Sequence, residues 1–239
     1  MEISRQKVVI VGGSSGIGLA SASTLSHEGY PVIITARTRE RMDAALDRIG
    51  GTASGRTLDY ADAAGIEAAF ESIGAFDHLV LTGAGPGAWG AFTELSREAL
   101  RAAFDNKFWG YFDTLQAALP YLAERGSITL LGGAAARAML PGTAGLAAVN
   151  GAVERMGMTL AKELAPRRVN VVSPGLVDTP AYDWMPPEAR RKMLEGASAE
   201  LPTQRYGNPE DLADAVLFLV RNPYITGTVL DIDGGVRLG

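Results

Sequence analysis

Short hydrophobic runs alternate with longer mixed segments along the whole chain. The runs are rich in Val, Ile and Leu, which is typical of parallel strands buried on both faces. They cover residues 7–11, 31–35, 55–58, 78–82, 127–131, 168–172 and 228–232. The segments between them have the apolar spacing of amphipathic helices. These segments cover residues 16–28, 39–49, 62–72, 97–123, 142–164 and 209–220.

This alternation predicts one α/β domain over residues 1–239. We expect a doubly wound sheet of about seven parallel strands, with helices on both faces. Residues 178–204 contain four prolines and break the pattern. They are predicted to form a loop with one or two short helices, which in a sheet of this type lies over the ligand.

A glycine-rich turn, Gly12-Gly13-Ser14-Ser15-Gly16-Ile17-Gly18, joins the first strand to the first helix. Its glycines allow a tight turn and a close approach of the backbone to a pyrophosphate, which the helix N-terminus attracts. A turn of this kind at the head of a βαβ series predicts a Rossmann-type dinucleotide site. The expected contacts are Gly12, Ser14, Ser15, Gly16, Ile17 and Gly18.

The end of the second strand indicates which dinucleotide binds. An NAD site needs a carboxylate here for the ribose 2′-hydroxyl, and Ala36 supplies none. Arg37 can bind a 2′-phosphate instead, a contact worth about 1.5–3 kcal/mol, and Ser14 can add a hydroxyl. We therefore predict NADP(H) as the cofactor; the alternative is that Arg37 is a solvated residue at a helix start.

Composition narrows the function classes. The net charge is -5, and no basic stripe is present, so nucleic acids and anionic membranes are disfavoured as partners. The absence of cysteine excludes disulfides and thiolate metal sites, and His27 and His78 lack ligand spacing, so no metal site is predicted. Neither a signal peptide nor a membrane span is recognisable, and we expect a cytoplasmic protein.

At this point the sequence resembles the short-chain dehydrogenase/reductase family from end to end. The glycine turn is similar to the family's TGxxxGxG motif, and residues 82–85 stand where the family has NNAG. Residues 173–179 are similar to its PG loop, which backs the nicotinamide, and residues 226–227 and 233–235 match its C-terminal signature. The resemblance implies further cofactor contacts at Asp59, Ala84, Gly85, Pro174, Gly175, Val177 and Thr179.

The same resemblance fails at the active site. The family reduces carbonyls with Tyr-x-x-x-Lys on one helix, a Ser thirteen residues before the Tyr, and an Asn on the preceding helix. Here Leu146 replaces the Tyr, Asn150 the Lys, Gly133 the Ser and Lys107 the Asn, although the adjacent Asn106 leaves a one-residue ambiguity. Positioned acid–base catalysis accelerates reactions by about 10²–10⁴-fold, and leucine cannot transfer a proton. The standard mechanism is therefore excluded.

Three residues are candidates for the remaining chemistry. Lys107 and Arg137 are cations that could stabilise an oxyanion or bind a carboxylate, and Asn150 keeps donors for the ribose hydroxyls. Alternatively, Lys107 pairs with Asp105 or extends to solvent, and Arg137 belongs to the loop surface or to a subunit contact.

These residues leave three functions open. The first is an NADP(H)-dependent oxidoreductase acting on a small molecule that is already activated, such as an imine or an enone. The second is an isomerase or cyclase that retains the cofactor. The third is an NADP(H) sensor or assembly protein without catalysis, which a pocket filled by Leu146, Met139 and Trp184 would favour. The family resemblance also implies a homodimer or homotetramer formed by the helices at 97–123 and 142–164.

Overall fold

The described part of the chain contains seven parallel strands in one sheet, in the order β3-β2-β1-β4-β5-β6-β7. The computed structural model describes residues 6–59, 62–83 and 87–238. The strand order reverses between β1 and β4, and ligands bind at the carboxyl ends of strands beside such a switch point. The strands are β1 (Val8–Val11), β2 (Val32–Ala36), β3 (Ser54–Thr57), β4 (Phe76–Leu81), β5 (Leu122–Leu131), β6 (Arg168–Pro174) and β7 (Val229–Ile232).

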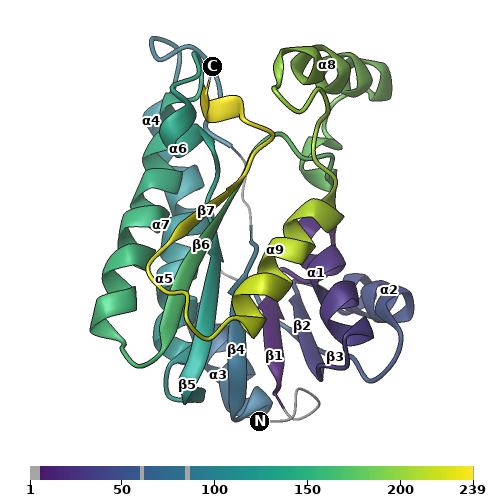
Figure 1. Cartoon of the computed structure of the whole chain (residues 1–239), viewed down its shortest axis with the longest axis vertical. Coiled ribbons are helices and arrows are strands. Elements are labelled where there is room, and N and C mark those ends of the chain that lie inside the picture. The colour runs from purple at the N-terminus through teal and green to yellow at the C-terminus, as the bar shows by residue number, and fades with distance from the viewer. Residues whose placement is uncertain (1–5, 60–61, 84–86, 239) are drawn as a thin grey trace.

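Helices cover both faces of this sheet (Figure 1). One face packs against α1 (Gly16–His27), α2 (Arg39–Ile49) and α9 (Pro209–Arg221). The other packs against α3 (Ala63–Ile73), α5 (Gly110–Ala118) and α7 (Ala144–Glu163). α4 (Arg97–Ala103) continues into α5 through a π-helical turn, η2 (Phe104–Trp109), and α6 (Ala135–Ala138) follows β5. The predicted doubly wound α/β fold is confirmed.

Strand β1 shows why the hydrophobic runs are continuous. Val8 and Ile10 belong to the core under α1 and α9, whereas Val9 and Val11 belong to the core under α3 and α5. Successive side chains of a strand point to opposite faces, so a strand covered on both faces needs apolar residues at every position.

Three predicted segments differ from the structure. β3 is the sheet edge, and its Ser-Gly-Arg-Thr sequence is mostly exposed because only β2 pairs with it. The helix predicted at 97–123 ends at Ala118, and β5 begins at Leu122, which packs with Phe76 in the core. The segment 178–204 holds a short 3₁₀ turn and a 14-residue helix, α8 (Pro187–Glu200), with proline at its first position.

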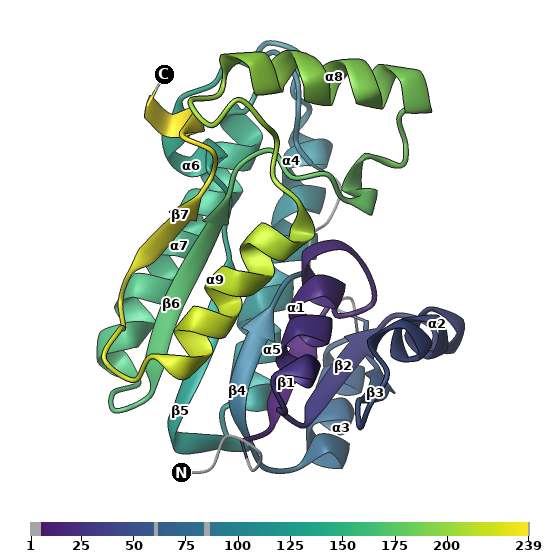
Figure 2. The ribbon, with the colours of Figure 1, turned by 45° about the vertical axis from the view of Figure 1, so that its right-hand side comes forward.

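α8 lies beyond the carboxyl ends of the strands, on the same side as the C-terminus (Figures 1 and 2). Its position agrees with the expectation that residues 178–204 cover the ligand edge. None of the helices in the described residues has the length and apolar content that a membrane span requires.

Candidate active site

The glycine-rich turn has the geometry that a bound pyrophosphate needs. Gly12 and Gly16 have φ values of 85° and 50°, in the left-handed region that favours glycine. A Cβ on Gly18 would lie 2.2 Å from the carbonyl oxygen of Gly12, so a side chain there would displace the turn. Thr82 Oγ1 donates to the carbonyls of Val11 (2.9 Å) and Gly12 (3.1 Å) and fixes the turn to β4. These features fit a dinucleotide phosphate at the N-terminus of α1.

The PG loop lies directly against this turn. A Cβ on Gly16 would lie 3.3 Å from Thr179 Cβ, so the loop after β6 reaches the start of α1. Gly175 is packed against Asp233, whose Cα would lie 2.6 Å from an added Cβ. Val177 is buried, and Pro174 ends β6. The structure thus brings together two sequence-predicted parts of the cofactor site, Gly12–Gly18 and Pro174–Thr179.

The remaining predicted cofactor residues are more exposed. Arg37 is exposed and directly follows the buried Ala36 at the carboxyl end of β2. Asp59 is also exposed, two residues after β3 ends. Ala84 and Gly85 lie outside the described residues. In the turn itself, Ser14 and Ile17 are half-buried and Ser15 is exposed at the N-terminus of α1.

Lys107 and Asn150 contact each other at the carboxyl end of β5. Lys107 Nζ donates to the carbonyl oxygen of Gly132 (2.8 Å) and to Asn150 Oδ1 (2.7 Å). The adjacent Asn106 is exposed, and its Nδ2 donates to the carbonyl of Ala102, so it does not take part in this contact. Burial lowers the pKa of Lys107 to about 8, although nearby Glu154 opposes this effect. An ammonium group has three N–H donors, and the described residues supply acceptors for two.

The Asn150 amide also explains the glycine at the position of the family's serine. A Cβ on Gly133 would lie 2.6 Å from Asn150 Nδ2, so the amide occupies the space that a side chain at residue 133 would need. Leu146 lies one helical turn before Asn150 on α7 and is half-buried. No proton donor is therefore present at positions 133 and 146.

Comparisons with known proteins agree with this geometry. A family model described as enoyl-(acyl carrier protein) reductase matches residues 11–237. A solved small-chain dehydrogenase in complex with NADPH is 36% identical over 98% of this chain and 99% of that chain, with a TM-score of 0.86. The chain belongs to the short-chain dehydrogenase/reductase family.

Two further proteins are similar to this chain over most of its length. An uncharacterized oxidoreductase of Methylorubrum extorquens is 35% identical over 96% of both chains. A short-chain oxidoreductase of Pseudomonas aeruginosa, solved in its apo form and described as containing an atypical catalytic center, is 29% identical over 98% of both chains, with a TM-score of 0.88. The chain is therefore similar over its length to an oxidoreductase of the family with a non-standard site.

Within the family's pattern, the lysine and the asparagine have exchanged helices. The resemblance would place the lysine on α7 and the asparagine on the preceding helix. Here Asn150 is on α7, and Lys107 is in the π-helical turn η2. π-Helical turns occur frequently at functional sites, because they reposition side chains within a helix. An ammonium group is thus retained beside the end of β5, but it comes from the opposite helix.

Arg137 is held by two carboxylates. Its two terminal nitrogens donate to the carboxylate of Asp231 on β7, one of them at 3.0 Å, and its Nε lies 3.3 Å from Glu154 Oε2. The sequence analysis expected this cation to face a substrate, whereas the structure shows its charge balanced by Asp231 and Glu154. A catalytic role for Arg137 stays a prediction.

Glu154 was missed by the sequence analysis. It is only 7% exposed and lies on the sheet-facing stripe of α7, four residues after Asn150. Its Oε1 has no hydrogen-bond partner among the residues that the structure describes. Burial raises its pKa, and the nearby cations Arg137 and Lys107 oppose that rise. The signal was present in the sequence, since a carboxylate on the apolar face of a helix is rarely buried without a partner or a purpose.

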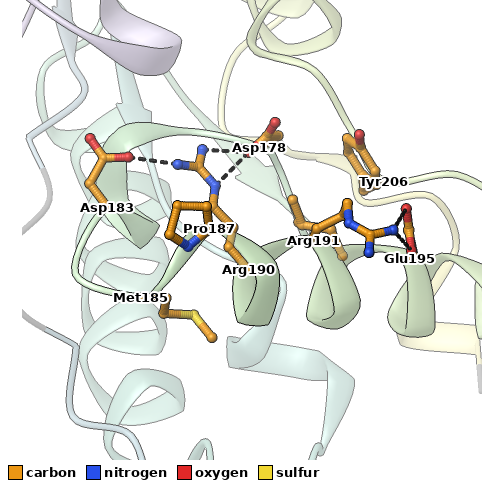
Figure 3. Close-up of a pocket in the computed structure, with 9 residues that line it drawn as sticks. Asp178, Asp183, Met185, Pro187, Arg190, Arg191, Glu195 and Tyr206 are labelled. Carbon is orange, nitrogen blue, oxygen red and sulfur yellow. Dashed lines mark hydrogen bonds and ion pairs between the residues drawn. The ribbon is translucent and has the colours of Figure 1, made fainter.

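A cavity of about 340 Å³ lies beside α8 (Figure 3). Its arginines are paired: Arg190 binds Asp178 and Asp183, and Arg191 binds Glu195 at 3.1 Å. Lys107 and Asn150 do not line it.

The apolar plug considered for a sensor is not formed in the described residues. Met139 and Trp184 are 90% and 74% exposed, so neither fills a pocket with Leu146. The side chain of Trp89 is also exposed.

Proposed function

We propose that this chain is an NADP(H)-dependent oxidoreductase that reduces a small electrophile which is already activated, such as an iminium ion or a polarised enone. Family membership and the NADPH-bound relative support the cofactor. The observation that carries the proposal is the Lys107 ammonium, held by Gly132 and Asn150 with one N–H that has no acceptor among the described residues, in a site where Leu146 stands at the position of the family's tyrosine.

Separate groups of residues would bind the cofactor and stabilise the reacting substrate. The Gly12–Gly18 turn would hold the pyrophosphate, Arg37 the 2′-phosphate, and Val177 and Thr179 the nicotinamide carboxamide. The bound cofactor supplies a hydride. Lys107 would stabilise negative charge that develops on the substrate, and because its pKa is about 8, it would also be able to donate a proton near neutral pH. Asn150 would orient Lys107.

The missing hydroxyls define the substrate class. A plain ketone needs a proton on its oxygen as the hydride arrives, and the family supplies it from tyrosine. Leu146 cannot do so, and the Gly133 position holds no side chain. An iminium carbon needs no such proton, and the enolate formed from an enone needs mainly charge stabilisation. We therefore expect no measurable NADPH oxidation with simple aldehydes or ketones.

The test compares Lys107→Met with Lys162→Met, a matched change at an exposed position of α7. NADPH binding is measured by calorimetry, and NADPH oxidation is measured with a panel of cyclic imines, enones and plain ketones. Turnover of an enone, whose enolate needs the Lys107 charge, should fall at least about tenfold in Lys107→Met, while Lys162→Met turns over normally and NADPH affinity stays unchanged in both variants. Rapid reduction of a plain ketone, or full activity in Lys107→Met, would contradict the proposal. NADPH binding without any turnover would favour a sensor.

The proposed assembly is a homodimer or homotetramer through α4, α5 and α7. Two large apolar side chains on this surface are exposed, Trp109 and Met158, which supports a partner there. Sedimentation at micromolar protein should show a species larger than one chain.

A further inference from the structure

The most unusual buried group in the described residues outside the proposed cofactor site is the carboxylate of Glu154. A buried carboxylate with an unpaired oxygen is costly unless nearby cations stabilise it. One oxygen, Oε2, faces Arg137 Nε at 3.3 Å. The other, Oε1, has no hydrogen-bond partner. Arg137 is already engaged by Asp231, so it does not account for both oxygens.

Gly132 connects Glu154 to Lys107. A Cβ on Gly132 would lie 3.5 Å from Glu154 Oε1, so the carboxylate packs against this glycine. The carbonyl oxygen of the same glycine accepts the hydrogen bond from Lys107 Nζ at 2.8 Å. The carboxylate and the ammonium therefore lie on either side of one residue, in surroundings where charges interact more strongly than in water.

We propose that Glu154 is a positioning residue that stabilises the ammonium form of Lys107 from behind Gly132, without touching the substrate. This inference rests on the proposed role of Lys107 as the cation of the active site. It explains why a carboxylate stands on the buried stripe of α7, one turn beyond Asn150. It also explains how a half-buried lysine keeps its proton near neutral pH although burial disfavours its charge.

The other charged groups on the elements around Lys107 are paired with one another or exposed. On α6 and β7, Arg137 and Asp231 neutralise each other, and Arg237 joins Asp231 at 2.9 Å. Within η2, Asp105 is exposed. On α5, the buried hydroxyl of Tyr111 donates to the carbonyl of Leu81. The charged residues of α4 are exposed; they are Arg97, Glu98 and Arg101. Glu154 is thus the buried carboxylate that acts on Lys107.

The experiment measures the titration of Lys107 directly, independently of turnover. The chain has four lysines, so lysine labelled with carbon-13 at Cε gives few signals, and Lys107→Met assigns the one of interest. Glu154→Gln should lower the midpoint of the Lys107 titration by about one pH unit. Glu163→Gln, an exposed change on the same helix, should leave it unchanged. The descending limb of the pH–rate profile should move in the same direction as the midpoint.

Thermal unfolding of each variant shows that it folds, and Glu154→Asp provides a second test. Aspartate keeps the charge but is one methylene shorter. The titration midpoint of Lys107 in Glu154→Asp should therefore lie between those in the native protein and in Glu154→Gln. A midpoint that is unchanged in both variants would overturn the inference. If the titration midpoint of Lys107 shifts but Lys107→Met turns over normally, the role of Glu154 stands and the proposed function fails. If the midpoint does not shift and Lys107→Met is inactive, the proposed function stands and the role of Glu154 fails.

Discussion

Buried polar side chains are held in opposite ways at the middle of strand β5 and at its carboxyl end. At the middle of β5, His78, Ser127 and Arg168 are register partners on three neighbouring strands. His78 Nδ1 and Ser127 Oγ are 2.8 Å apart, and Arg168 donates to three backbone carbonyls at 2.8–3.2 Å. At the carboxyl end, Glu154 Oε1 and Arg137 Nε have no hydrogen-bond partner in the described part of the chain.

This difference indicates which polar groups stabilise the fold and which remain able to react with a ligand. Groups whose hydrogen bonds are all made within the protein contribute to folding, because breaking them leaves unpaired partners behind. Groups with unused donors or acceptors remain able to interact with a ligand. Substitutions of His78, Ser127 and Arg168 should therefore change stability and spare cofactor binding, whereas substitutions of Lys107 and Glu154 at the carboxyl end should change reactivity more than stability.

The largest expected effect is on stability, in Arg168→Met. The change leaves the carbonyls of Leu219, Val220 and Ile225 without their donor, and an unpaired buried group costs about 1–3 kcal/mol. The free energy of unfolding should fall by about 3 kcal/mol or more, measured by urea denaturation. NADPH affinity should stay unchanged; loss of binding in a folded variant would break the comparison.

His78 should make stability depend on pH. Burial lowers its pKa from 6.5 to about 4, so the folded protein resists protonation that the unfolded chain accepts. Stability is then full above pH 6.5 and is lost as the pH falls towards 4, by about 3 kcal/mol in total. Urea denaturation of the native protein and His78→Gln between pH 4 and 7 checks this. An equally steep pH dependence in the variant would assign the effect to other groups.

Arg37→Ala tests the cofactor end of β2. Arg37 is exposed, so its loss should not affect folding, but NADPH should bind about 10–100-fold more weakly because the 2′-phosphate loses a charge-assisted contact. NADH affinity, measured by the same calorimetry, should hold. Equal affinities for NADPH and NADH in the native protein would refute the assignment of NADP(H).

The smallest effect is expected for Arg137→Met. Its side chain is 37% exposed and its charge is balanced by Asp231 and Glu154, so solvent reduces the value of these ion pairs. Stability should fall by about 1 kcal/mol or less, and turnover should change less than about threefold. A loss of turnover as large as that of Lys107→Met would return Arg137 to the substrate site.

The sequence was informative where structure depends on local backbone geometry. The order of strands and helices and the turn at Gly12–Gly18 follow from hydrophobic period and glycine spacing, both of which are local signals. β3 was harder, because an edge strand has little apolar pattern. The length of α8 was underestimated because prolines stand at its start and just beyond its end.

The candidate active site was only partly visible, because its contacts join residues distant in sequence. The Lys107–Asn150 contact spans 43 positions, and the Arg137–Asp231 contact spans 94. Spacing from the family motif identified Lys107 and Asn150 as exchanged residues, but it gave no partner for Arg137. Glu154 matched no motif position, and only the packing of α7 on the sheet shows that it is buried.

The direction of the Lys107 side chain depends on the extra residue in the π-helical turn η2. A π-helical turn holds one residue more than an α-helical turn, and each residue rotates a helix by about 100°. Loss of one codon within residues 104–109 would close the turn into ordinary α-helix and change the direction in which Lys107 points. The change would reach the hydrophobic core only through Phe104 and Phe108, which are half-buried and pack against it, because η2 contains no fully buried residue. A single deletion or insertion in η2 can therefore remove or create a cationic site on this scaffold. No destabilised intermediate sequence is needed between the two states.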